Sequence, residues 1–218
     1  MTELAIFDLD YTLTQKGTWG RFIARMMRGK LIHVPGLLWA AGWTQLQYQR
    51  GKQPRVEVKR AMMRQSILGL SKTVLENEAD EFIADDLEGG MDERVLSALR
   101  EHQEKGHHVL IASAAVDLLV DRYESALGVD GSVSTQMKWG QDDRLTDTFA
   151  TENCYGPEKM IRIATWIKAQ GLNPTRVTAY SDSASDAPLL EFADKAVMVR
   201  PSRKARRYAQ RKGFEIWS

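Results

Sequence analysis

The feature that most constrains the fold of this chain is a series of short apolar stretches, each followed by polar residues and a helical pattern. Stretches of this length and composition are typical of buried strands, and the segments between them carry apolar residues at helical spacing. Strands that alternate with helices predict a parallel sheet with helices on both faces. The expected strands are residues 4–8, 107–112, 132–136, 176–181 and 196–200.

The alternation is interrupted directly after the first expected strand. Residues 15–88 show helical patterns and no convincing strand, and the pair Gly89-Gly90 marks a break before the next helix. We therefore predict an α/β fold with two parts. A Rossmann-like, doubly wound core would comprise residues 1–14 and 89–218, and an all-helical cap, residues 15–88, would be inserted into it.

The overall composition restricts partners and location. The 218 residues include 30 Lys and Arg against 29 Asp and Glu, so the net charge does not indicate a nucleic-acid partner and we expect none. The single cysteine, Cys154, excludes a disulfide within the chain and is typical of a reducing compartment. The first residues do not resemble a signal peptide, so we expect a cytoplasmic protein.

Charge is nevertheless unevenly distributed. Residues 15–64 contain eleven basic residues and one acid, and within them residues 31–49 carry no Lys, Arg, Asp or Glu. This uncharged segment contains Trp39 and Trp43, but its glycines, proline and amides make it a poor membrane span. Its simplest interpretation is the core of a small helical bundle. The alternative is a surface that binds anionic lipid headgroups.

Two aspartates mark the end of the first expected strand. Asp8 and Asp10 are two residues apart, which places their side chains on one face of a strand. Neighbouring carboxylates repel each other, so such a pair indicates a cation, a shared proton, or both. Reactive side chains also follow other expected strands or begin a helix, and the carboxyl ends of parallel strands meet at one edge of a sheet. These side chains are Ser113, Lys159, Asp182 and Asp186.

Carboxylates, a hydroxyl and an ammonium at one edge are a consistent set of groups for phosphoryl transfer. Oxygen ligands suit Mg²⁺, which also binds substrate phosphate. A carboxylate can attack phosphorus to form an aspartyl-phosphate, while the cation and a lysine neutralise the transferred group.

At these residues the chain resembles the haloacid dehalogenase (HAD) superfamily of phosphatases. Its four motifs occur in order between residues 4 and 200. They are Asp8-Leu9-Asp10-Tyr11-Thr12, then Ser113 after an apolar stretch, then Lys159, and then Asp182-Ser183-Ala184-Ser185-Asp186. The cap after the first motif and the run from Ser113 to Asp117 are similar to the phosphoserine phosphatase-like branch.

The resemblance implies a role for each motif residue. Asp8 would be the nucleophile, and Asp10 would be the general acid and then the general base. Mg²⁺ would be held by Asp8, the backbone carbonyl of Asp10, and Asp182, with support from Asp186. The substrate phosphate would be bound by Thr12, Ser113, the amide of Ala114, and Lys159.

The chain departs from the family pattern at several positions. Tyr11 replaces a residue that is often small, Ala114-Ala115 replaces a glycine pair, and Ser185 replaces a frequent asparagine. Residues 15–19 lack the acidic residue expected to bind the amino group of phosphoserine. These departures leave phosphatase chemistry intact and argue against phosphoserine as the substrate.

The resulting expectation is Mg²⁺-dependent hydrolysis of a small phosphorylated metabolite through an aspartyl-phosphate. Two alternatives remain open. One is a lipid phosphatase of the phosphatidylglycerophosphate type that acts at a membrane surface through the basic cap. The other is a phosphate-binding regulator that keeps the fold without turnover.

Overall fold

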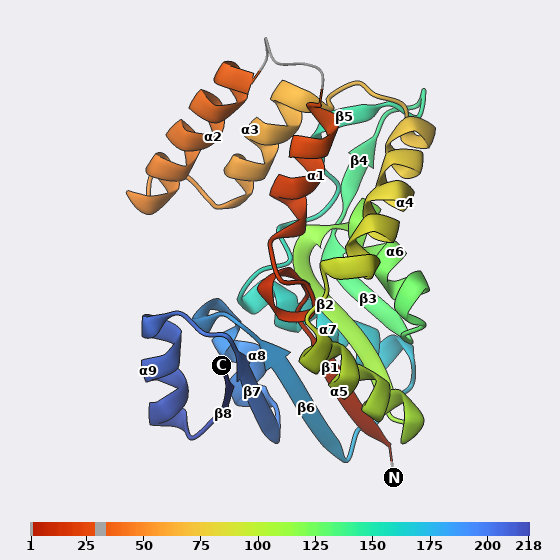
Figure 1. The fold of residues 1–218 in the computed structure, drawn as a ribbon, viewed down its shortest axis with the longest axis vertical. Coiled ribbons are helices and arrows are strands. Elements are labelled where there is room, and N and C mark those ends of the chain that lie inside the picture. The colour runs from red at the N-terminus through yellow and green to blue at the C-terminus, as the bar shows by residue number, and fades with distance from the viewer. Residues whose placement is uncertain (1, 29–33) are drawn as a thin grey trace.

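The computed structural model describes residues 2–28 and 34–218, and its central feature is a six-stranded parallel sheet (Figure 1). The strand order is β3-β2-β1-β6-β7-β8, so the first strand lies in the middle of the sheet. Every neighbouring pair is parallel. The strands are β1 (Glu3–Phe7), β2 (His108–Val116), β3 (Gly131–Thr135), β6 (Arg176–Ser181), β7 (Lys195–Val199) and β8 (Glu215–Trp217).

Helices cover both faces of this sheet, which confirms the predicted doubly wound α/β fold. Successive residues of a strand point to opposite faces, and here they enter separate apolar clusters. Phe7 of β1 lies in the cluster that contains residues of α5 and α6, whereas Ile6 lies in the cluster that contains residues of α7, α8 and α9. These helices are α5 (Glu93–Glu104), α6 (Asp117–Leu127), α7 (Pro157–Ala169), α8 (Ala187–Phe192) and α9 (Arg203–Lys212).

Two strands differ from the sequence-based expectation. β2 does not end at Ser113 but continues to Val116, because the residues that follow Ser113 are small or apolar and do not break the strand. The strand β8 was not expected. It has three residues, too few to show an alternating pattern, and it pairs with β7 only after α9 has folded back across the sheet.

The elements between the first strand and α5 are helical in the part of this segment that the structure describes, residues 8–28 and 34–92. A tight turn, η1 (Leu9–Leu13), follows β1. The start and the end of the segment between β1 and α5 lie side by side. The Gln15 amide, near its start, donates to the Gly90 carbonyl, near its end, at 2.8 Å. The cap helices, a name we use for the four helices that follow η1, are α1 (Thr18–Met26), α2 (Val34–Gln49), α3 (Val56–Ser66) and α4 (Lys72–Gly89).

A hairpin from a later part of the chain joins the cap helices. Strands β4 (Met137–Trp139) and β5 (Leu145–Phe149) are antiparallel and lie beside α3 and α4 (Figure 1). The Gly69 amide donates to the Leu145 carbonyl at 3.0 Å, and the Lys72 amide donates to the Asp143 carbonyl at 2.8 Å. The boundaries of the cap at residues 15 and 88 stay a prediction.

Part of the basic charge in residues 15–64 is paired between cap helices. Arg25 of basic α1 contacts three acids of α4, which are Glu78, Glu81 and Asp85. Arg21 of α1 binds the buried Asp86 carboxylate, with one N–H to O distance of 2.9 Å. Arg21 and Arg25 are therefore neutralised by acids of α4 across one helix–helix contact.

The prediction that Trp39 and Trp43 form the core of a helical bundle is wrong. Both lie on α2, where Trp39 is 71% exposed and Trp43 is 47% exposed. Their rings stack on each other, 6.1 Å apart at an interplanar angle of 2°. Residues 31–33 of the same uncharged segment lie outside the described residues. None of the helices in residues 2–28 and 34–218 combines the length and hydropathy needed to cross a membrane.

Candidate active site

The sheet brings the expected reactive residues to one edge. Asp8 follows β1, which lies between β2 and β6. Ser113 lies on β2, and Asp182 follows β6. The Asp8 amide donates to the Tyr180 carbonyl at 2.9 Å, which extends the sheet to the point where the side chain projects. These residues line one cavity of about 180 Å³. Its lining consists of Asp8, Asp10, Tyr11, Arg55, Ser113, Ala114, Tyr155, Lys159, Asp182, Ser183, Ser185 and Asp186.

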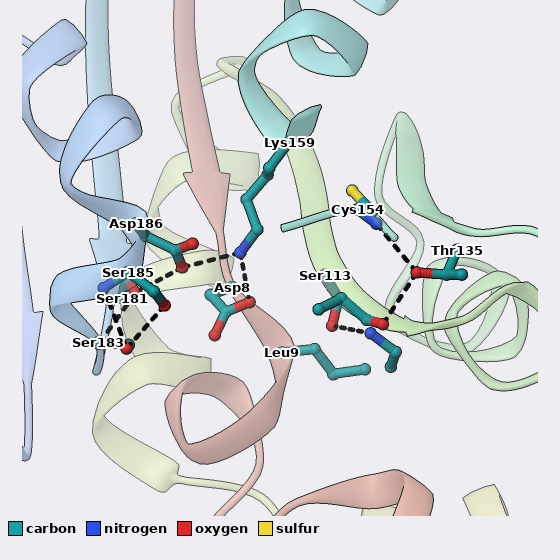
Figure 2. Close-up of polar contacts among 12 residues, drawn as sticks. Asp8, Leu9, Ser113, Thr135, Cys154, Lys159, Ser181, Ser183, Ser185 and Asp186 are labelled. Carbon is teal, nitrogen blue, oxygen red and sulfur yellow. Dashed lines mark hydrogen bonds and ion pairs between the residues drawn. The ribbon is translucent and has the colours of Figure 1, made fainter. Parts of the chain in front are cut away.

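Lys159 lies between two carboxylates at the bottom of this cavity. Its Nζ is 2.9 Å from Asp8 Oδ1 and 2.8 Å from Asp186 Oδ2 (Figure 2). Gly156, at a φ of +58°, makes the turn that starts α7 and brings the lysine to this edge. Burial alone would lower the pKa of Lys159, but Asp186 and Asp8 together hold that pKa above its usual value. The lysine is therefore charged throughout the physiological pH range.

The site contains more negative charge than Lys159 can balance. Burial raises the pKa of Asp8 to about 8, and the neighbours Asp186 and Asp182 add to the increase while Lys159 opposes it. Burial and then Asp186 raise the pKa of Asp182 to about 6. Asp186 Oδ1 is buried and has no hydrogen-bond partner. A crowded carboxylate site with an unpartnered oxygen is the environment that a divalent cation relieves.

The oxygen donors at this cavity are compatible with Mg²⁺. Among residues 2–28 and 34–218, no three side chains of His, Cys, Asp or Glu are arranged as a ready metal cluster. The expected ligand set needs only two carboxylates and a backbone carbonyl, because Mg²⁺ keeps several waters. The oxygen-only donors and the excess negative charge at Asp8 and Asp182 fit this ion.

Asp10 is held by the first cap helix. Its Oδ1 accepts a hydrogen bond from the amide of Thr18, the first residue of α1, at 2.7 Å. The free N–H groups and the dipole at a helix N-terminus stabilise a carboxylate in this position. The start of α1 thus fixes the orientation of the Asp10 side chain.

The turn between Asp8 and the cap is held by a residue from a distant strand end. Arg200, which follows β7, donates from Nη2 to the carbonyls of Tyr11 at 2.9 Å, Thr12 at 3.2 Å and Thr14 at 3.1 Å. Tyr11 adopts a φ of +62°, which is uncommon for a non-glycine residue, so this turn needs outside support. The sequence offered no signal for Arg200, because 186 to 189 residues separate it from its partners.

Of two residues expected to bind phosphate, one lines the cavity and the other does not. Ala114 lines the cavity, beside Ser113. Thr12 is fully buried, does not line the cavity, and its Oγ1 has no hydrogen-bond partner. The phosphate-binding role of Thr12 stays a prediction.

Several lining residues were not expected from the sequence. Tyr11, Ser183 and Ser185 fall inside the motifs, so their proximity to the site could have been inferred. Arg55 precedes α3 of the cap and stacks its guanidinium on the Tyr155 ring, 4.7 Å from the centroid. No sequence motif contains Arg55, and only the packing of α3 on the core brings it to the cavity.

The model of the haloacid dehalogenase-like hydrolases matches residues 5–191, and the chain belongs to this family. A relative from Streptomyces azureus, called inhibition of morphological differentiation protein, is 30% identical over 97% of this chain and 76% of its own length. Phosphoserine phosphatase SerB1 of Mycobacterium tuberculosis is 29% identical over 99% of this chain and 70% of its own length. The predicted superfamily and the prediction of a hydrolase are therefore confirmed.

Solved structures share the fold. A protein of unknown function from Bordetella pertussis Tohama I has a TM-score of 0.83 and 24% identity, with 100% of this chain and 99% of that chain covered. A structure described as a phospho-aspartyl intermediate analogue of phosphoserine phosphatase has a TM-score of 0.66 and 18% identity, with 99% and 92% covered. At these identities the similarity establishes the fold alone.

Proposed function

We propose that this protein hydrolyses the phosphate monoester of a small metabolite, with Mg²⁺ as cofactor and Asp8 as the phosphorylated residue. The observation that carries the proposal is the buried contact of Lys159 with both Asp8 and Asp186, at the same cavity as Ser113 and Asp182. The family match supports hydrolysis, and the names of a relative and of a structural neighbour support a phospho-aspartyl route.

Each residue has a role in this mechanism. A carboxylate oxygen of Asp8 forms a bond to phosphorus while the ester P–O bond breaks, and Asp10 gives its proton to the leaving oxygen. Water then attacks the phosphorus and gives a proton to Asp10, while the bond between the Asp8 oxygen and phosphorus breaks. The products are inorganic phosphate and free Asp8. Lys159 favours the ionised form of Asp8 that attacks, since its ammonium contacts that carboxylate directly, and a bound Mg²⁺ would favour the same form.

The remaining residues hold charge in place. Mg²⁺ would be held by Asp8, the Asp10 carbonyl and Asp182, with Asp186 in support, and it would neutralise charge on the transferred phosphoryl group. Ser113 and the Ala114 amide would bind phosphate oxygens. Arg55 and Tyr155 also line the cavity, which favours a substrate with a second anionic or polar group next to its phosphate.

The test of this proposal is an isosteric replacement of the nucleophile. Asp8→Asn should reduce turnover of p-nitrophenyl phosphate with Mg²⁺ by at least roughly 10³-fold, because the amide cannot form the intermediate. Asp143→Asn is the matched control. Asp143 is exposed, lies at a φ of +54° that asparagine tolerates, and should leave activity unchanged. Full activity in folded Asp8→Asn would contradict the proposed nucleophile.

A second candidate function is hydrolysis of a lipid phosphate at a membrane surface. It is favoured by α2, whose exposed side presents Leu38, Trp39, Trp43 and Leu46 without any charged residue. The basic residues Arg28, Arg50 and Lys52, all exposed, lie before and after this helix in the sequence. Tryptophan and leucine beside basic residues suit the interface of an anionic bilayer. Inactivity on every phosphomonoester tested would instead favour the non-catalytic regulator.

A further inference from the structure

The strand that carries Ser113 is irregular where phosphate is expected to bind. The pairing of β2 with β3 shifts its register between Ala112 and Val116, so the residues between them lie outside the regular ladder. The Ala115 amide donates to Ser113 Oγ at 3.0 Å instead of to a neighbouring strand. The backbone of this segment therefore depends on side chains for its hydrogen bonds.

The carbonyl of Ala114 is bonded by two side chains. Thr135 Oγ1 lies 3.0 Å from it, and the Nζ of Lys59 donates to it as well. Thr135 Oγ1 also lies 3.2 Å from Asn153 Oδ1. It accepts from the Cys154 amide at 3.1 Å (Figure 2). A hydroxyl has one proton, so Thr135 cannot donate to Ala114 and Asn153 together. The ammonium of Lys59, with three N–H groups, supplies the missing donors.

The partners of Lys59 are all neutral oxygens. Its Nζ lies 2.5 Å from Asn153 Oδ1 and 3.4 Å from Thr135 Oγ1, in addition to the Ala114 contact. In the part of the chain that the structure describes, no carboxylate forms an ion pair with it. Burial, and then the nearby cation Arg55, lower the pKa of Lys59 to about 7, while Asp10 opposes this change. An ammonium in such surroundings is costly to keep, and an apolar side chain would pack there at less cost.

Lys59 comes from the cap, whereas its partners come from the core side of the cavity. It lies on α3, one turn after Arg55, and it reaches the segment that follows Ser113 on β2. The contact exists only while α3 lies against that segment. It therefore connects the position of a cap helix to the conformation of the backbone beside the cavity.

We propose that Lys59 is a positioning residue, which holds the Ser113-Ala114 segment in its phosphate-binding conformation when the cap helices lie on the core. This inference rests on the proposed function, since it assigns phosphate binding to Ser113 and to the amide of Ala114. Lys59 does not line the cavity and acts through the Ala114 carbonyl.

The experiment measures phosphate binding and turnover in Lys59→Met, which keeps the length of the side chain and removes its donors. Binding of inorganic phosphate with Mg²⁺, measured by isothermal titration calorimetry, should weaken by 10-fold or more, because a charge-assisted hydrogen bond is lost. The KM for p-nitrophenyl phosphate should rise by a similar factor, with a smaller change in kcat. Lys59→Arg should recover most of the affinity. Lys204→Met, at an exposed position on α9, is the control and should match the wild type.

Thermal melting separates positioning from a structural role. Lys59→Met should melt no lower than the wild type without phosphate, because a costly charge has been removed. A lower melting temperature with unchanged phosphate affinity would show a structural latch and overturn the proposal. Unchanged affinity with unchanged melting would overturn it as well. If Lys59→Met does not fold, Lys59→Leu, which also lacks a hydrogen-bond donor, serves in its place, with the same outcomes.

Failure of the two proposals can be distinguished. A wild-type protein that binds no phosphate and turns over no phosphomonoester would reject the proposed function and, with it, the role of Lys59. If the wild type is active and Lys59→Met has the same phosphate affinity and the same KM, only the role of Lys59 is rejected.

Discussion

At the scale of single residues, one buried lysine contacts the carboxylates of the site without balancing their charge. Lys159 contacts Asp8 and Asp186, and Asp182 adds a third carboxylate close by. The pKa of Asp8 is nevertheless raised to about 8, because burial and two like charges outweigh the lysine. Ionisation of Asp8 is therefore unfavourable without a metal, at the position where a cation and a phosphate would bind.

This imbalance predicts a dependence of stability on pH in metal-free protein. Asp8 binds its proton more tightly when folded, with a pKa of about 8, than when unfolded, near 3.8. Stability should consequently fall as the pH rises from about 4 to about 8, since the folded state keeps a proton that the unfolded state releases. Asp8→Asn removes this titration, so in EDTA at pH 8 it should melt roughly a few degrees above the wild type.

Thermal melts in EDTA between pH 4.5 and 8 test this expectation, with Asp143→Asn as the control variant. The advantage of Asp8→Asn should shrink toward pH 4.5. Adding Mg²⁺ at pH 8 should raise the melting temperature of the wild type more than that of Asp8→Asn. An advantage that is independent of pH would show that Asp8 is not the source of the excess charge.

At the scale of elements, α2 is unlike the other cap helices. α1 and α4 bury apolar side chains and pair their charges, whereas α2 has no charged residue and exposes Trp39 and Trp43. An exposed apolar side on a helix is costly in water unless a partner covers it. The alternative function at a membrane surface therefore depends on α2.

A vesicle flotation assay tests α2 directly. The wild type should float with phosphatidylglycerol vesicles more than with phosphatidylcholine vesicles, because basic residues flank the helix. The double variant Trp39→Ala and Trp43→Ala should lose at least about half of the floated protein, since each ring buries apolar area in the interface. Ile161→Ala, which removes an exposed apolar residue from α7, should float like the wild type.

Two outcomes would exclude the membrane role of α2. One is the absence of flotation together with no hydrolysis of phosphatidylglycerophosphate. The other is concentration-dependent dimerisation, lost in the double tryptophan variant and measured by sedimentation without vesicles, which would assign the exposed side of α2 to a second copy of the chain.

At the scale of the whole molecule, the cap helices and the sheet share one apolar core. A single buried cluster includes Phe7 of β1, Phe22 of α1, Ile83 of α4 and Val120 of α6. Side chains in one close-packed cluster do not separate without exposing apolar surface on both sides. The segment inserted after the first strand is thus not expected to unfold independently of the sheet.

Native-state hydrogen exchange checks this expectation. Slow amides in α4 and in β1 should open with the same free energy and the same dependence on denaturant, because they belong to one cooperative unit. Peptides from α2, whose described side chains lie outside that cluster, should exchange faster and provide the internal comparison. An opening of α4 at lower denaturant than β1 would instead indicate that the inserted segment is a separate domain.

Sequence reasoning succeeded where the signal was local. Five strands were placed within a few residues of their observed bounds, because each is a run of apolar residues between breaks. Asp8, Asp10, Ser113, Lys159, Asp182 and Asp186 were expected at one edge, and all six line the same cavity. It failed where the signal was weak or non-local, as for β8 with three residues and for the side of α2 that has no partner.

The sequence by itself determined the α/β fold, the family, and the set of reactive residues, because strand periodicity and short motifs are encoded by neighbouring residues. Only the tertiary structure decided which other side chains act with them. Through the packing of α3, Arg55 lines the cavity and Lys59 bonds to the Ala114 carbonyl beside it. Arg200 reaches the turn after Asp8 from another strand end. The same packing left Trp39 exposed, since apolar composition requires burial somewhere but does not specify the partner that provides it.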